Sequence, residues 1–184
     1  MNLGDRSRTW AILLAAALII AGCSRDPNVL KKKHFDRGEA YFQQGKYQEA
    51  AIEFQNAIQF DSKYSQAHYE LAQTYLKQGN WSRAYQELLR TAQLAPENSK
   101  AQLDLANLLL AAGKLPEARD RAETVLKTDP QNAQAQAIVS SADASQGDLP
   151  KALGEAQQAV HMDPNRAQSF LVLAAIQEKS KDLK

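Results

Sequence analysis

Apolar residues recur along most of the chain at the spacing of an α-helix. Leu71, Ala72 and Tyr75 follow His68 at i+3, i+4 and i+7, which places all four on one helix face. A second apolar stripe with the same period occupies residues 84–92. The pattern predicts two amphipathic helices in succession, and the fold class that it favours is all-α.

The same pattern returns every 34 residues. Four glycines keep this spacing: Gly45, Gly79, Gly113 and Gly147. An alanine follows each glycine after five residues, and prolines follow the last three glycines after seventeen: Pro96, Pro130 and Pro164. A glycine suits the turn between two helices, because only glycine adopts positive φ at little cost. The proline ends the second helix, and Pro116 and Pro150 suit the first turn of a second helix.

These markers divide the chain into units 31–64, 65–98, 99–132 and 133–166, with a partial unit 167–184. The second unit resembles the tetratricopeptide repeat in eight residues: Leu71, Ala72, Tyr75, Gly79, Trp81, Ala84, Leu88 and Pro96. The resemblance implies an α-solenoid of helix-turn-helix repeats over residues 31–184. A single helix pair cannot bury both of its faces, so stability comes from stacking neighbouring units.

Two places depart from this pattern. The fourth unit has Ser140 and Asp143 where the second has Ala72 and Tyr75, so we expect it to be the least protected part of the array. Residues 170–176 are apolar nearly all round, whereas a final helix normally has a polar outer face. Either further repeats follow, or a partner or a second copy of the chain covers this helix.

The N-terminus has the layout of a secretory signal. Arg6 and Arg8 precede an uncharged stretch, Trp10–Gly22, that is too short to span a bilayer comfortably. The residues around Cys23 resemble the lipobox of bacterial lipoproteins, which implies a signal peptide of residues 1–22 and a lipid on Cys23. Residues 23–30 then form the lipidated cysteine and a short tether. The alternative is a free, buried cysteine in a retained helix.

The charge of the remaining chain argues against nucleic-acid binding. The whole sequence carries a formal charge of +1, and removal of residues 1–22 takes away two arginines and one aspartate, which leaves it neutral. The basic residues near the anchor either are exposed to solvent around it or contact anionic lipid head groups. In lipoproteins an acidic residue after the cysteine accompanies inner-membrane retention, so Ser24 implies an outer-membrane anchor that faces the periplasm.

The sequence offers little for catalysis. It has no Gly-rich phosphate loop, zinc-protease pair or Ser/His/Asp order. We therefore expect a protein that is not an enzyme, with no catalytic residue, no cofactor and no metal site. The histidines His34, His68 and His161 are interpreted as packing or helix-end residues.

The resemblance implies that the first helix of each repeat lines a concave groove that binds a peptide. The predicted groove residues are Phe35, Glu39, Phe42, Tyr69, Gln73, Leu76, Leu103, Asn107 and Leu110. The fourth unit supplies only Ala137, Ser141 and Ala144, so the groove becomes shallower there. Some of these residues could instead pack between repeats. Lys32, Lys100 and Asn107 form only an incomplete clamp for a peptide carboxylate, so a helix or extended peptide with apolar anchors is the better ligand.

Together these features predict a membrane-anchored scaffold for protein partners that supports envelope assembly or export of exopolysaccharide or protein. It is similar to the tetratricopeptide lipoproteins of PEP-CTERM/exosortase exopolysaccharide systems. A pilotin or assembly factor for an outer-membrane secretin or β-barrel is one alternative. A recruiting subunit of a cell-wall enzyme is another.

Overall fold

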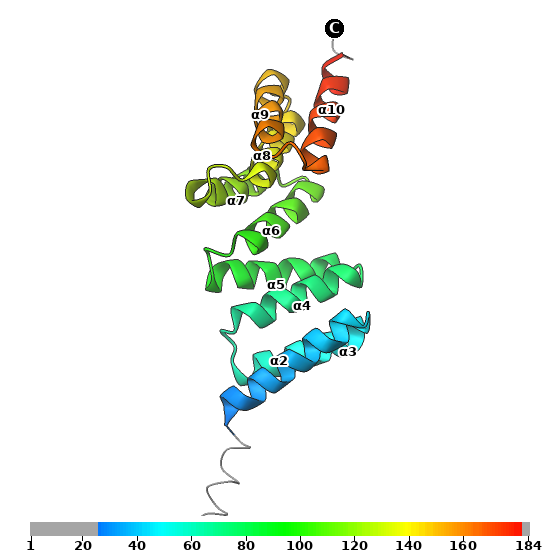
Figure 1. Cartoon of the computed structure of the whole chain (residues 1–184), viewed down its shortest axis with the longest axis vertical. Helices are drawn as coiled ribbons and strands as arrows, with labels where there is room; N and C mark the ends of the chain where they lie inside the picture. The colour runs from blue at the N-terminus through cyan, green and yellow to red at the C-terminus, as the bar shows by residue number, and fades with distance from the viewer. Residues whose placement is uncertain (1–25, 182–184) are drawn as a thin grey trace, which may run out of the picture. The chain divides into compact units, whose positions relative to one another are not determined.

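The computed structural model describes residues 26–181, and most of them are helical. This part of the chain contains nine α-helices and no strand (Figure 1). In order they are α2 (Pro27–Gln43), α3 (Tyr47–Phe60), α4 (Ser65–Lys77), α5 (Trp81–Leu94), α6 (Ser99–Ala111), α7 (Leu115–Thr128), α8 (Ala133–Gln146), α9 (Leu149–Met162) and α10 (Ala167–Lys181). The all-α fold class expected from the sequence is confirmed.

The chain divides into two compact units, each described by itself. The first unit, Met1–Asn80, contains α2, α3 and α4, and the second, Trp81–Lys184, contains α5 to α10. The second helices of successive repeats begin 34 residues apart, at Tyr47, Trp81, Leu115 and Leu149. The structure therefore keeps the predicted repeat length through both units.

Each predicted glycine turn is present. Gly45, Gly79, Gly113 and Gly147 have φ angles of 72°, 71°, 71° and 97°. At the first of them the N–H of Lys46 donates to the carbonyl of Tyr41 at 3.0 Å, and the N–H of Gly45 donates to that of Phe42 at 3.0 Å. This bond pattern satisfies the last carbonyls of the preceding helix. An added Cβ would meet nothing within 4 Å at these glycines, so the backbone angle alone requires them.

The first helix begins earlier than the sequence indicated. The N–H of Asn28 donates to the Asp26 side chain at 2.8 Å, and Pro27 occupies the first turn, where its missing N–H costs nothing. Residues 27–30, which we assigned to the tether, are therefore part of α2. The predicted signal peptide and Cys23 lie outside the described residues. No helix between residues 26 and 181 is both long and apolar enough to cross a membrane.

Aromatic rings fill the core of the first unit. The Phe35 ring on α2 lies 5.6 Å from the ring of Phe54 on α3 and 5.1 Å from that of Tyr64. Gly38 is buried against Phe54, and a Cβ at this position would lie 2.7 Å from two atoms of the Phe54 ring. The α2–α3 hairpin therefore needs a glycine here to admit the large ring.

Small residues allow the helices of the second unit to pack closely together. Ala106 on α6 and Ala122 on α7 hold the repeat positions of Gly38 and Phe54, and both are fully buried. They belong to a core cluster from α6, α7 and α8, which also contains Leu103, Val125, Ala135, Ile138 and Val139. A second cluster joins α8, α9 and α10 through Ala144, Leu149, Ala152, Ala156 and Ile176.

Candidate functional site

The first helices of three successive repeats in the second unit, α6, α8 and α10, line a hollow of about 430 Å³. A hollow of about 360 Å³ adjoins it between α8 and α10, and the two share Ser141, Gln168 and Val172. We call this combined surface the α6–α8–α10 groove. Its lining residues are Asn107, Leu110, Gln134, Ala137, Ile138, Ser141, Ala144, Ser145, Arg166, Gln168, Leu171, Val172, Ala175, Ile176 and Lys179.

The 34-residue repeat places equivalent side chains along the groove. In the hollow of about 430 Å³, three pairs of lining residues are one repeat apart: Gln134 and Gln168, Asn107 and Ser141, and Ile138 and Val172. Each pair keeps its chemical type, which is respectively amide, polar and β-branched apolar. The groove thus offers hydrogen-bonding groups and apolar contacts at recurring positions, a combination that suits an extended peptide.

The charged side chains that line the groove are cationic. Nη1 of Arg166 donates to Oε1 of Gln134 at 3.2 Å, and its Nε lies 3.4 Å from Oδ2 of Asp163. Nζ of Lys179 donates to the carbonyl of Ala144 at 2.9 Å. The described lining residues include no acidic side chain. The groove therefore favours a ligand that carries negative charge.

The structure places the nine residues predicted to line a groove in different environments. Asn107 and Leu110 line the α6–α8–α10 groove. Phe35 and Leu103 expose only 4% and 5% of their surfaces. Phe35 packs against two aromatic rings, and Leu103 belongs to the core of α6, α7 and α8. The prediction that these two side chains face a ligand is wrong, because neighbouring helices cover them.

The other five predicted residues lie in the first unit. Glu39 is exposed, and the other four are half-buried: Phe42, Tyr69, Gln73 and Leu76. The Phe42 ring lies edge-on to the Tyr47 ring with centres 5.5 Å apart, so part of its surface is used within the α2–α3 hairpin. A binding role for these residues stays a prediction.

The α10 side of the groove was not predicted. Arg166 and Gln168 lie at the start of the fifth unit, which we had considered only for its apolar stretch. Ala137, Ser141 and Ala144, expected to make the fourth unit shallow, all line the groove. The 34-residue spacing could have identified the α10 side of the groove from the sequence, because Gln168 lies one repeat after Gln134.

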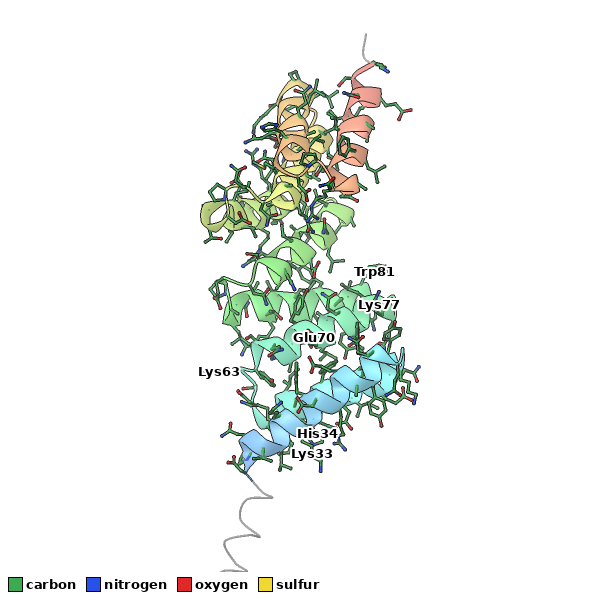
Figure 2. All side chains as sticks on the ribbon, in the orientation of Figure 1. Lys33, His34, Lys63, Glu70, Lys77 and Trp81 are labelled. Carbon is green, nitrogen blue, oxygen red and sulfur yellow. The ribbon has the colours of Figure 1, made fainter. Side chains whose placement is uncertain are left out.

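A second hollow, of about 670 Å³, lies between α5 and α6. Trp81 at the start of α5 is 61% exposed (Figure 2), and Tyr85 follows one turn later. Nζ of Lys114 lies 5.8 Å from the centre of the Tyr85 ring and places a cation at the rim. This hollow is suited to a large apolar side chain of a partner.

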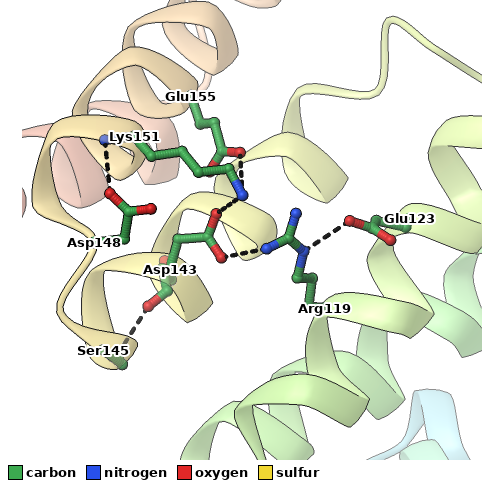
Figure 3. Close-up of polar contacts among 8 residues, drawn as sticks. Arg119, Glu123, Asp143, Ser145, Asp148, Lys151 and Glu155 are labelled. Carbon is green, nitrogen blue, oxygen red and sulfur yellow. Dashed lines mark hydrogen bonds and ion pairs between the residues drawn. The ribbon is translucent and has the colours of Figure 1, made fainter.

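A buried acid links α7, α8 and α9. Asp143 on α8 exposes 2% of its side chain, and both of its oxygens meet cations (Figure 3). Nη1 of Arg119 on α7 donates to Oδ1 at 2.7 Å, and Nζ of Lys151 on α9 lies 2.7 Å from Oδ2. Arg119 also donates to Glu123 at 2.7 Å. A buried charge is tolerated when it is paired in this way.

The polar residues of the fourth unit are thus built into its core. Ser140 is fully buried, and its hydroxyl donates to the carbonyl of Ala152 on α9 at 2.7 Å. Both side chains are buried and held by partners from neighbouring helices. These two residues therefore give no reason to expect the fourth unit to be the least protected part of the array, and that ranking stays a prediction.

Glu155 on α9 is a second acid in this cluster. Its Oε1 lies 3.8 Å from Nζ of Lys151, and its Oε2 is buried without a hydrogen-bond partner. Burial, followed by the negative charge of Asp143, raises the pKa of Glu155 to about 7. The hydrogen bond to Asp143 raises the pKa of Lys151, which keeps the ammonium charged. Glu155 therefore takes up a proton near neutral pH.

Two of the histidines have protein partners. Nδ1 of His34 lies 2.6 Å from Oε2 of Glu53, and Nε2 of His68 lies 3.2 Å from the carbonyl of Ser62. Within residues 26–181, no group of three His, Cys, Asp or Glu side chains is arranged to hold a metal ion.

Two family profiles match the chain and together span more than half of it. One, described as TPR repeat, matches residues 38–79, and the other, described as Tetratricopeptide repeat, matches residues 86–142. Both matches coincide with the helix pairs and glycine turns described above. The chain is a tetratricopeptide repeat (TPR) protein.

Solved structures with the same fold support this assignment. MamA from Desulfovibrio magneticus RS-1 is 19% identical with a TM-score of 0.75, and the match covers 83% of this chain and 86% of that one. YrrB, a TPR protein, is 16% identical with a TM-score of 0.69 over 80% and 76% of the two chains. PilF from Pseudomonas aeruginosa is 15% identical with a TM-score of 0.69 over 85% and 71%. No curated protein matches the sequence of this TPR protein.

Proposed function

We propose that this TPR protein is a membrane-anchored scaffold that binds an extended, acidic segment of a partner protein in the α6–α8–α10 groove. The observation that carries the proposal is the groove itself, with its recurring amide and apolar positions and its cationic residues. Extended peptides gain affinity from polar contacts to their backbone and specificity from pockets for alternate side chains. Acidic side chains fit because Arg166 and Lys179 are the charged groups of the lining.

The likeness to YrrB lends this proposal some support. That protein is described as a TPR protein with an unusual peptide-binding site. Peptide capture on a TPR surface is therefore consistent with the fold. The sequence identity of 16% means that the likeness concerns the fold only.

The anchor is a proposal from sequence. Cys23 follows an apolar stretch and basic residues in the arrangement of a lipoprotein signal. Several acyl chains on Cys23 would hold the protein firmly at a membrane, since each buried methylene contributes about 0.8 kcal/mol. We place the scaffold at the outer membrane, facing the periplasm, in envelope assembly or export. The pilotin and cell-wall recruiting roles remain alternatives.

Selection from a random-peptide library with the full chain in detergent tests the groove. We expect the enriched peptides to be extended and rich in Asp and Glu. The double substitution Asn107→Ala with Gln168→Ala should weaken them at least tenfold, which corresponds to about 1.4 kcal/mol. Both residues are exposed in the groove, so the change removes hydrogen bonds without opening the core.

A matched control uses two exposed glutamines of α9 that do not line the groove, Gln157→Ala with Gln158→Ala. This variant should keep the affinity, and circular dichroism should be unchanged in both. An equal loss of peptide affinity in the two variants would contradict the proposed site, as would enrichment of basic peptides in the selection.

The anchor has an independent test. The mass of the natural protein, extracted from membranes, should correspond to a chain that begins at Cys23 and carries acyl groups. Cys23→Ser should release the protein from the membrane fraction or block its maturation. An unmodified Cys23 in a chain that retains residues 1–22 would contradict membrane attachment by lipid.

A further inference from the structure

The hollow between α5 and α6 meets the α6–α8–α10 groove at Asn107. This exposed side chain lines both surfaces. Its neighbours on α6 divide between the two, because Leu110 lines the groove and Leu108 lines the hollow. A peptide bound in the groove can therefore continue past Asn107 into the hollow.

The hollow lies inside the repeat array and is mostly apolar. Its walls are α5 from the second repeat and α6 from the third, so both neighbouring helices are in place and the space between them is still open. The apolar and aromatic residues of the lining are Trp81, Tyr85, Leu108, Leu109, Ala111 and Ala112. An accessible apolar surface of this kind is typical of a binding site.

One repeat earlier, the equivalent place between α3 and α4 is polar. A hollow of about 550 Å³ lies there, and polar and charged side chains make up most of its lining. Nε2 of Gln78 donates to the carbonyl of Tyr47 at 2.8 Å and joins the two helices. In the α5–α6 hollow, Ala112 and Trp81 hold the positions of Gln78 and Tyr47, so the bridging amide is replaced by a methyl group.

One repeat later, an ion pair occupies the equivalent place. Arg119 and Asp143 hold the positions of Tyr85 and Leu109. Nη1 of Arg119 donates to Oδ1 of Asp143 at 2.7 Å and links α7 to α8. The repeat pattern alone therefore does not make this place apolar, and the apolar lining is a property of the α5–α6 step.

We propose that the α5–α6 hollow binds one large apolar side chain, aromatic or leucine, of the same acidic peptide that the α6–α8–α10 groove holds. This inference rests on the proposed function, because the two surfaces share Asn107. Nζ of Lys114 lies 5.8 Å from the centre of the Tyr85 ring and adds a cation at the rim, which suits acidic residues beside the apolar one. The partner segment is thus an acidic stretch with an apolar anchor at one end.

The library selection with the full chain in detergent separates the hollow from the groove. Peptides enriched by the parent chain should carry an aromatic residue or leucine at one fixed end of the acidic stretch. Ala112→Gln should close the hollow with the amide that bridges α3 and α4 one repeat earlier. The first, second and fourth repeats have glutamine at this position: Gln44, Gln78 and Gln146. Peptides enriched by this variant should stay acidic and lose the fixed apolar residue.

Ala40→Gln is the matched control, because Ala40 is an exposed alanine of α2 that lines neither surface. This variant should enrich the same peptides as the parent chain. The parent should also bind an enriched peptide at least tenfold more tightly than its copy with alanine at the anchor. Ala112→Gln should bind the two peptides equally, with an unchanged circular dichroism spectrum. An anchor preference that persists in Ala112→Gln, or that is missing in the parent, would overturn the proposal.

A small probe tests the hollow without the groove. N-acetylphenylalanine should shift the indole N–H signal of Trp81 in NMR spectra of the full chain, with the signal assigned through Trp81→Phe. N-acetylalanine, which has the same carboxylate, should not shift it, and Ala112→Gln should abolish the response. A Trp81 signal that does not respond to N-acetylphenylalanine would overturn the assignment of the hollow even if acidic peptides bind the groove. A response without enrichment of acidic peptides would support the hollow and contradict the proposed function.

Discussion

Replacement of Glu155 by Gln is predicted to remove a pH dependence of stability from the α7–α8–α9 cluster. Burial and the charge of Asp143 raise the pKa of Glu155 from 4.5 to about 7 in the folded chain. The folded state then binds a proton more tightly than the unfolded state. The resulting stabilisation is complete below the unfolded pKa and is lost as pH rises through about 7.

The size of this effect follows from the shift. A pKa change of one unit corresponds to 1.36 kcal/mol, so the full shift would amount to about 3 kcal/mol. Glu155 is only partly buried and Lys151 lies close by, so solvent screening reduces the expected effect to about 1 to 2 kcal/mol. The parent chain should therefore lose this amount, relative to Glu155→Gln, between pH 5 and pH 8.

Urea unfolding of both chains, followed by circular dichroism at several pH values, measures the difference directly. The comparison with Glu155→Gln cancels the titration of carboxyl groups outside this cluster, because only residue 155 differs. Hydrogen exchange of α8 and α9 amides locates the effect. Glu117→Gln, at an exposed acid of α7, should leave the pH profile of the parent unchanged. A stability difference that does not vary with pH would refute the reasoning.

Three further predictions concern stability. Gly113→Ala should destabilise the chain by about 1 to 2 kcal/mol, because the φ of Gly113 is 71°. Gly154→Ala should stabilise it by about 0.5 to 1 kcal/mol, because Gly154 is an exposed helical residue with free space around its Cα. Denaturant midpoints of the two variants and the parent measure both effects. Gly38→Ala should cost about 1 to 3 kcal/mol through its clash with Phe54, and Phe54→Leu should reduce that cost when the two are combined. Leu71→Ala should cost about 2 to 5 kcal/mol because Leu71 is 1% exposed, and a near-zero change would argue against its place in the core.

The repeat length and the turns were predictable because they depend on local chemistry. A glycine at each helix corner is required by a positive φ, and a proline in a first turn lacks only an N–H that would be unpaired there. Both signals act over a few residues. The second helices accordingly begin where the 34-residue register places them.

Burial of individual side chains was less predictable because it depends on neighbouring helices. Phe35 and Leu103 have the spacing of groove residues, yet adjacent elements cover both. Ser140 and Asp143 suggested a weak unit, but their partners come from α7 and α9, at sequence distances that periodicity does not reveal. Polar residues in a helical pattern can therefore mark a paired core as well as a loose one.

The central claim is that the α6–α8–α10 groove holds the partner peptide. Hydrogen exchange of the full chain, with and without a saturating acidic peptide from the library selection, tests this most directly. We predict slower exchange along α6, α8 and α10 and unchanged exchange in α7 and α9. Protection confined to other helices would contradict the account.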